Sequence, residues 1–119
     1  MAIAQSAWGK KAENIQILDI RKISDISDYF VICSANSDRG VKTIADNIER
    51  YLKDSKEPII GLEGYSKGKW VLIDSVDVVA NIFYEPVREF YDIEGLWIEA
   101  PRIDIDFDLG VDDKKADTK

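Results

Sequence analysis

The side chains of this chain that could do chemistry are carboxylates gathered around a tryptophan. Glu63 and Asp74 lie in two short apolar runs, Trp70 opens the second run, and Asp77 follows it. Neighbouring carboxylates can hold a divalent cation, transfer protons or bind a cationic side chain. Because the block has no nucleophile with a matching base, it favours a binding face for a basic partner over an active site.

The composition of the chain excludes several kinds of chemistry. There is no histidine, which removes His-based general-base catalysis, Ser-His and Cys-His nucleophiles and the common zinc sites. The one cysteine, Cys33, cannot form an internal disulfide, and this favours a reducing compartment. Cys33 lies inside an apolar run, so we expect a buried and inert thiol.

The charge of the chain points to a basic protein as partner. The net charge is −7 and the pI about 4.6. An acidic chain does not bind phosphate backbones through bulk charge, so we expect little direct nucleic-acid binding. No apolar stretch reaches the roughly 20 residues needed to span a membrane, and the start of the chain does not resemble a signal peptide. We therefore expect a protein that does not bind membranes.

The apolar pattern predicts one α/β domain with a mixed five-stranded sheet. A chain of 119 residues fits a single domain. The short links after the third and fourth predicted strands indicate two antiparallel hairpins. The helices and strands alternate in the order α-β-β-α-β-β-β-α. The predicted strands are residues 15–21, 28–34, 59–63, 70–74 and 78–84.

Three helices should flank this sheet. A short one lies within residues 1–12, and a longer one follows an N-cap at Asn36 or Ser37. A third begins at Pro86, a residue favoured in the first helical turn. The apolar stripe of the second helix consists of Val41, Ile44, Ala45, Ile48 and Leu52, and that of the third of Val87, Phe90, Tyr91 and Leu96.

The domain is expected to end at residue 101, and residues 102–119 form an acidic tail. Residues 102–108 alternate apolar and acidic side chains, which fits an edge strand or a solvated linker, and from Gly110 we expect disorder. Asp104, Asp106 and Asp108 alternate as in a metal carboxylate motif. Because magnesium sites need carboxylates that converge from rigid elements, a solvated tail is the favoured interpretation.

Three blocks of sequence cover residues 12–101 in a characteristic order and spacing. The first is AENIQILDIR, followed by DYFVICSANSDRGV and IAD; the second is GLEG, WVLID and DVV; the third is VREFYD and LW. Together they resemble the ribosomal silencing factor family, also called the Iojap family. The chain departs from the family pattern at Asn81, where histidine is usual, at Val76, where glycine is usual, and at residues 35–36, where Gly-Thr is usual.

The resemblance implies a translation repressor of the cytoplasm or of organelles. Such proteins bind the large ribosomal subunit through the universal ribosomal protein L-fourteen, a basic protein on the intersubunit face, and sterically block subunit joining. The implied fold is similar to that of nucleotidyltransferases, without their activity, and members are often homodimers off the ribosome. The departures bear on fine geometry and dimerisation more than on the partner.

The expected contact surface consists of Glu63, Tyr65, Trp70, Leu72, Asp74 and Asp77. Trp70 could instead be a core residue covered by a helix, but the lysines and glycines before it and the resemblance favour an exposed interface residue. The carboxylates could simply be solvated. Trp70, Leu72 and Asp74 share one face of a strand, which suits an Arg or Lys from a basic partner. Asn81 could be satisfied in the core or belong to this surface.

An enzyme is the rival interpretation. In active nucleotidyltransferases a Gly-Ser pair stands where this chain has residues 34–39, with paired aspartates downstream that hold magnesium. Here no glycine precedes the helix, and Asp38 would repel phosphate, so an N-cap and packing loop is favoured. We predict no catalytic residue, cofactor or metal. A magnesium-dependent nucleotidyltransferase remains the alternative function, and a self-associating scaffold is a third.

Overall fold

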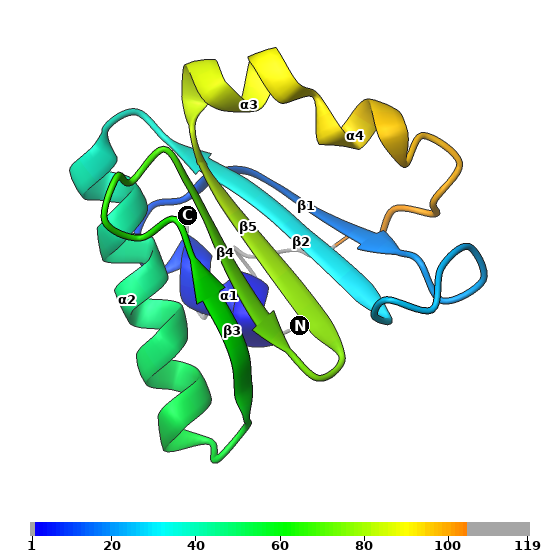
Figure 1. Ribbon diagram of the computed structural model, residues 1–119, viewed down its shortest axis with the longest axis horizontal. Helices are drawn as coiled ribbons and strands as arrows, with labels where there is room; N and C mark the ends of the chain where they lie inside the picture. Colours follow the sequence, from blue (N-terminus) through cyan, green and yellow to red (C-terminus); the bar gives the residue numbers. More distant parts are fainter. Residues whose placement is uncertain (1, 105–119) are drawn as a thin grey trace, which may run out of the picture.

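The computed structural model describes residues 2–104 of the chain (Figure 1). Helices and strands follow one another as the sequence predicts, except that the last helix is divided in two. The elements are α1 (Ala2–Trp8), β1 (Glu13–Asp19), β2 (Tyr29–Ala35), α2 (Asp38–Asp54), β3 (Ile59–Glu63), β4 (Trp70–Ser75), β5 (Val78–Tyr84), α3 (Glu85–Tyr91) and α4 (Ile93–Leu96).

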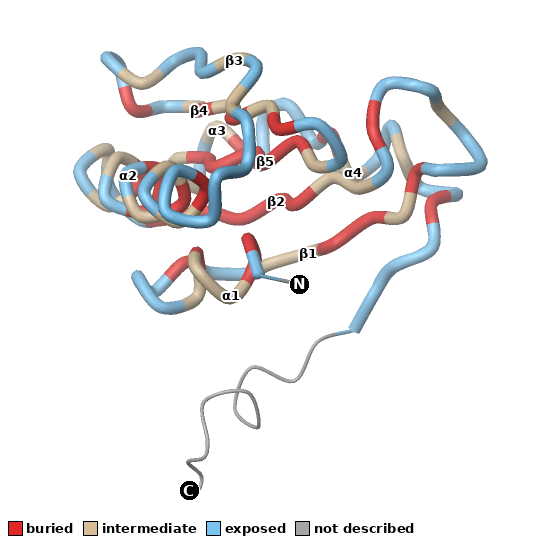
Figure 2. The backbone as a smooth tube through the Cα atoms, turned by 90° about the horizontal axis from the view of Figure 1, so that it is seen from below, coloured by how far each residue is buried: buried red, intermediate tan, exposed pale blue. Residues whose placement is uncertain are grey.

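The five strands form one mixed sheet in the order β1-β2-β5-β4-β3. β2 and β5 pair in parallel, and the remaining pairs are antiparallel. The two predicted hairpins, β3–β4 and β4–β5, are confirmed, and so is the α/β class. Buried residues run along β2 and β5 in the middle of the molecule (Figure 2).

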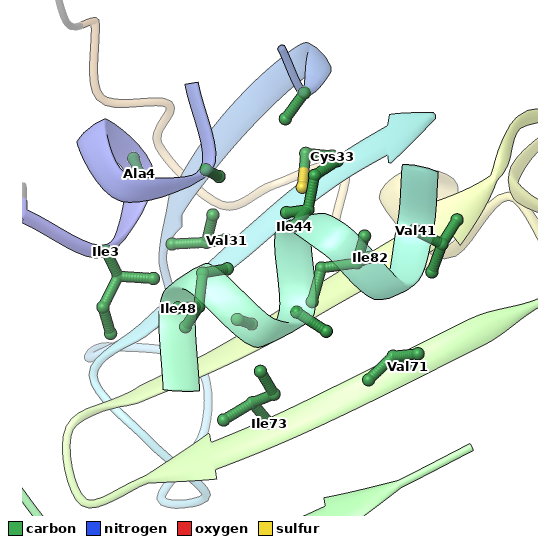
Figure 3. Close-up of a cluster of buried hydrophobic side chains, with 14 of the residues drawn as sticks. Ile3, Ala4, Val31, Cys33, Val41, Ile44, Ile48, Val71, Ile73 and Ile82 are labelled. Atoms are coloured by element: carbon green, nitrogen blue, oxygen red, sulfur yellow. The ribbon is translucent and has the colours of Figure 1, made fainter. Parts of the chain in front are cut away.

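One face of the sheet is closed by α1 and α2. The predicted apolar stripe of α2 is buried throughout, and Val41, Ile44 and Ile48 point at side chains of β2, β4 and β5 (Figure 3). Ser37 is the N-cap, because its Oγ accepts a hydrogen bond of 3.0 Å from the amide of Gly40. On this face, the apolar residues that recur at helical spacing in α2 therefore meet the apolar residues that alternate along the strands.

The other face is covered over part of its width by α3 and α4. Beneath these helices lies a second apolar cluster. On β4, the residues facing this side are only partly buried, whereas those facing α2 are buried. This alternation leaves β3 and β4 open on the face opposite α2. The second cluster consists of Leu18, Ile20, Ile32, Phe83, Ile93 and Ala100.

The prediction of one continuous final helix was wrong. Asp92 has a φ of +46° and its amide donates to the carbonyl of Arg88, so α3 ends there and α4 starts in a new direction. The helical spacing therefore does not continue to Leu96, which is 77% exposed. Phe90 is 81% exposed, so it does not line the inner side either.

The chain pairs with the sheet slightly beyond the predicted boundary at residue 101. The amide of Asp19 donates to Pro101, and the amide of Ile103 donates to Ile17, each at 2.9 Å. Residues 101–103 therefore form a short antiparallel bridge along β1, with Arg102 opposite Leu18. Residues 105–119, with Asp106, Asp108 and the stretch predicted to be disordered, lie outside the described residues. Within residues 2–104, no helix has the length and apolar character needed to cross a bilayer.

Candidate partner-binding face

Strand β4 presents the predicted alternation. Val71 and Ile73 are buried against α2, whereas Trp70, Leu72 and Asp74 are partly exposed on the opposite face. Glu63 of β3 is the register partner of Leu72 and therefore lies on the same face. The structure thus brings together four of the six predicted residues, Glu63, Trp70, Leu72 and Asp74, which we call the open β4 face.

Trp70 is neither a core residue nor a free one. Its ring lies 4.8 Å from that of Phe83 and 5.1 Å from that of Tyr91, measured between centroids. One edge borders a shallow depression of about 270 Å³, lined by Glu63, Gly64, Trp70 and Leu72. Gly64 has a φ of +81°, and a Cβ there would collide with the carbonyl oxygen of Trp70. Glycine therefore lets the chain turn closely against the backbone of Trp70.

Asn81 of the neighbouring strand β5 fixes the orientation of the Trp70 indole by a hydrogen bond. Asn81 is 3% exposed, and its Oδ1 accepts a hydrogen bond of 3.1 Å from the indole Nε1. Among the described residues, its Nδ2 has no hydrogen-bond partner. The structure therefore places Asn81 in the core, where it supports the open β4 face without being exposed on it.

An aromatic strip extends from Trp70 to helix α3. Tyr91 packs on Trp70, and Phe90 meets Tyr91 edge-to-face at 5.1 Å between ring centroids. We call Trp70, Tyr91 and Phe90 the aromatic strip. The sequence predicts Phe90 and Tyr91 in the apolar stripe of the last helix, whereas the structure leaves them 81% and 52% exposed.

Tyr65 and Asp77 do not lie on the open β4 face. Tyr65 packs on the α2 side of the sheet, where the ammonium of Lys42 lies 5.7 Å from its ring centroid. A hydrogen bond with Asp46 raises the pKa of Tyr65. Asp77 is exposed at the β4–β5 turn, and its carbonyl accepts from the amides of Asp28 and Tyr29.

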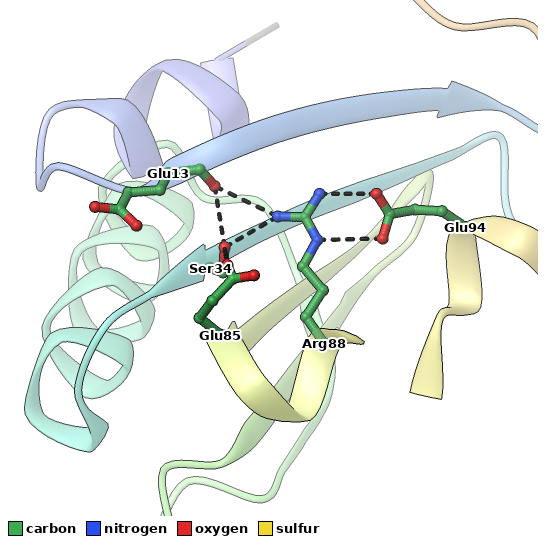
Figure 4. A network of polar contacts seen from close by, with 5 residues as sticks. All are labelled: Glu13, Ser34, Glu85, Arg88 and Glu94. Carbon is green, nitrogen blue, oxygen red and sulfur yellow. Dashed lines mark hydrogen bonds and ion pairs between the residues drawn. The ribbon is translucent and has the colours of Figure 1, made fainter. Parts of the chain in front are cut away.

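A buried arginine holds helices α3 and α4 on the sheet (Figure 4). Arg88 is 7% exposed, and its Nε and Nη2 donate to the two carboxylate oxygens of Glu94 at 3.1 and 2.9 Å. Its Nη1 donates to Ser34 Oγ at 3.0 Å, and Ser34 Oγ donates to Glu85 at 2.8 Å. The hydrogen bonds from Arg88 lower the pKa of Glu94. No pattern in the sequence predicted this network, which fixes α3, the helix that carries Phe90 and Tyr91.

The loop at residues 34–39 is an N-cap and packing loop. Ser37 is occupied as the helix cap, and the carboxylate of Asp38 accepts from Lys69 Nζ at 2.9 Å. Within residues 2–104, no cluster of three or more His, Cys, Asp or Glu side chains could hold a metal ion. Cys33 is buried, and burial raises the pKa of its thiol to about 12, which confirms the predicted inert environment.

Comparison with known proteins gives a consistent family. A family model described as "Ribosomal silencing factor during starvation" matches residues 1–119. The chain is 40% identical over 100 residues to the Ribosomal silencing factor RsfS of Bacillus subtilis, covering 84% of this chain and 85% of the relative. It is 26% identical to a mouse protein named "Mitochondrial assembly of ribosomal large subunit protein 1", covering 87% of this chain and 52% of that protein.

Solved structures agree with these matches. A crystal structure of a Chromobacterium violaceum protein superposes with a TM-score of 0.78 at 34% identity, covering 80% of this chain and 79% of that one. A Bacillus halodurans structure gives a TM-score of 0.78 at 35% identity, covering 87% of this chain and 95% of that one. The family model and the relatives establish that this chain belongs to the ribosomal silencing factor family.

Proposed function

We propose that this protein represses translation by binding the large ribosomal subunit through the universal ribosomal protein L-fourteen and blocking subunit joining. Its family supports a role on the ribosome. The observation that carries the finer proposal is the exposed aromatic strip beside Glu63 and Asp74 on the open β4 face. Aromatic side chains rimmed by carboxylates suit a basic protein surface.

The aromatic strip has the properties of an interface centre. Trp70 and Tyr91 are held by packing before any partner arrives, so little rotamer freedom is lost when they are buried. Phe90 projects from them and is 81% exposed. Glu63 lines the depression beside the tryptophan, and Asp74 lies further along β4 on the same face. Both carboxylates can accept hydrogen bonds from lysine or arginine. The site therefore combines apolar area with charge selectivity.

Steric occlusion requires no chemistry from this chain. The alternative, a magnesium-dependent nucleotidyltransferase, would need an anion-binding loop at residues 34–39. There the side chain of Ser37 already caps the amide of Gly40, and the carboxylate of Asp38 stands in the first turn. The N-terminus of α2 is therefore not open as a cradle for a nucleotide phosphate. We propose that the protein works in the cytoplasm, forms a homodimer off the ribosome, and acts on the ribosome as a binding module.

Gradient sedimentation with purified subunits tests this function. The protein should co-sediment with large subunits and not with small ones, and it should lower the yield of joined ribosomes without modifying RNA. Immobilised L-fourteen should retain it in the absence of RNA. Equal binding to both subunits would refute the proposal. Incubation with labelled nucleotides and magnesium tests the enzyme alternative, and light scattering of the free protein tests the homodimer.

A further inference from the structure

A corner of the molecule next to the start of strand β4 collects positive charge. Arg39 and Lys42 stand in the first turns of α2, and Lys67 and Lys69 stand in the link between β3 and β4. Figure 1 shows that link beside the start of α2. We call these four residues the basic corner. Their clustering contrasts with the net charge of −7 of the whole chain.

The two segments of the basic corner are held close together at Gly68 of the β3–β4 link, which packs against the start of α2. Gly68 is buried with a φ of +68°, and a Cβ on it would lie 3.1 Å from the carbonyl oxygen of Asp38 and 3.2 Å from Lys42 Cε. A side chain there would crowd the helix, and the positive φ itself favours glycine, so Gly68 suits this close approach. The close approach brings Lys67 and Lys69 next to Arg39 and Lys42.

Two of the four cations are held in place. Lys69 Nζ binds the carboxylate of Asp38 at 2.9 Å and lies 4.8 Å from the ring centroid of Tyr84. Lys42 lies over the ring of Tyr65, whose hydroxyl pairs with Asp46 one turn further along α2. The nearby carboxylates thus have partners within the corner. Arg39 and Lys67 are exposed, and within residues 2–104 neither side chain makes a hydrogen bond or ion pair.

We propose that the basic corner binds the phosphate backbone of RNA on the large subunit. This inference rests on the proposed function, and it assigns a second partner to the same docking event. Lys69 and Trp70 are consecutive in the chain, so the basic corner adjoins the open β4 face at the start of that strand. A large ribosomal subunit offers basic protein surface beside RNA phosphates. The separation of acidic and basic surface on this chain matches such a composite target.

The proposal explains how an acidic chain can still use nucleic acid. Net charge predicts weak bulk attraction, but phosphate contacts depend on local cations. Each phosphate contact releases counterions, so a fourfold rise in salt should weaken binding about threefold per contact. Affinity for large subunits should therefore fall more steeply with salt than affinity for isolated L-fourteen in the absence of RNA.

The test uses the full chain and a charge-matched control. Arg39→Gln with Lys67→Gln removes two free cations of the basic corner. Lys53→Gln with Lys56→Gln removes the same charge at the other end of α2, about 20 Å away by helical rise. Both variants and the unaltered protein are titrated, at several salt concentrations, with purified large subunits, with isolated L-fourteen, and with a short RNA duplex at low salt. Thermal melts confirm that each is folded.

The basic-corner variant should bind large subunits roughly tenfold more weakly at low salt. The slope of log affinity against log salt should fall by about one for each phosphate that the variant no longer binds. Binding to isolated L-fourteen should not change, and binding to the RNA duplex should weaken. The control variant should retain its affinity for large subunits and its slope.

Three results would overturn the proposal. One is unchanged affinity and slope for large subunits in the basic-corner variant. A second is an equal loss of affinity in the control variant, which would assign the effect to net charge. A third is an equal loss of affinity for isolated L-fourteen, which would assign the corner to a protein contact. If the unaltered protein does not bind large subunits, the proposed function fails. The titration with the RNA duplex then tests phosphate binding by the basic corner on its own. If the basic-corner variant binds the duplex as tightly as the unaltered protein does, the phosphate-binding proposal is overturned.

Discussion

The two faces of the sheet are built differently, and the difference separates stability from recognition. The face toward α2 is closed, and its side chains from α2, β2, β4 and β5 are buried and apolar. The opposite face is covered by α3 and α4 over part of its width, and there a buried Arg88 and a half-buried Trp70 take part. We infer that the face toward α2 holds the domain together. The opposite face is less tightly packed and exposes the aromatic strip.

The largest expected effect comes from the closed face. Ile48 is fully buried in the centre of the α2 stripe (Figure 3), so Ile48→Ala should lower the free energy of unfolding by about 2–5 kcal/mol. Chemical denaturation measures this change. The fraction that remains folded should bind large subunits with unchanged affinity. A drop in binding larger than the unfolded fraction explains would show that the two faces are coupled.

The closed face was predictable because one repeating pattern determines it. Val41, Ile44 and Ile48 recur at helical spacing, and burying such a stripe leaves little choice of partner surface. The strand alternation around Trp70 was equally readable. These patterns place Glu63, Trp70, Leu72 and Asp74 on the observed side of the sheet.

The sheet face covered by α3 and α4 was predictable only in part, since its structure depends on single residues and not on a repeating pattern. The left-handed backbone at Asp92 ends α3 early, and the spacing of the apolar residues does not predict such a break. The burial of Arg88 depends on Glu94, which lies beyond the bend and accepts two hydrogen bonds from the guanidinium. Tyr65 lies on the α2 side of the sheet, away from the open β4 face, because it belongs to a link whose path depends on Gly64 and Gly68.

Trp70→Ala is the matching test on the open β4 face. Truncating a central interface tryptophan costs at least about 2 kcal/mol of binding, roughly 30-fold in affinity. Because the ring also packs on Phe83 and Tyr91, stability should fall as well, but by less than the roughly 3–5 kcal/mol typical of a fully buried tryptophan. A binding isotherm and a denaturation curve on the same sample measure both effects. If the folded fraction binds normally, the open β4 face is not the interface.

Asp74→Lys tests the charge of the same face. A lysine at position 74 of this face should repel a basic partner and weaken binding to isolated L-fourteen, while stability should change by no more than about 0.5 kcal/mol because the side chain is partly exposed. Asp74→Asn serves as the control, since it keeps the shape and removes the charge. Binding by the lysine variant as tight as that of the unaltered protein would argue against a basic partner.

The Arg88–Glu94 pair should make the open face sensitive to acid. The folded protein holds the pKa of Glu94 below its ordinary value, so the unfolded chain takes up a proton first as pH falls. The stabilisation is complete above the ordinary pKa of glutamate and is lost as pH falls through the lowered value. Glu94→Gln should cost about 1.5–2 kcal/mol at neutral pH, the lower part of the range for charged hydrogen bonds, because Glu94 is partly solvated.

Denaturation curves of both proteins at several pH values measure this effect. The difference in stability between the unaltered protein and Glu94→Gln should shrink as pH falls. Asp19, whose pKa is lowered to about 2 by its hydrogen bonds with Arg21, is present in both proteins and cancels in the comparison. A difference that stays constant with pH would mean that the ion pair does not hold α3 and α4.

The smallest expected effect separates the aromatic strip from ordinary exposed apolar surface. Phe90 and Leu96 are similarly exposed, but only Phe90 contacts Tyr91 in the strip. Neither truncation should change stability by more than about 0.5 kcal/mol, since each side chain is already in water. Phe90→Ala should nevertheless weaken binding to large subunits by at least about 1 kcal/mol, roughly fivefold, whereas Leu96→Ala should not. Equal weakening would extend the interface onto α4, and equal retention would confine it to β4, so this pair of titrations measures how far the open face reaches.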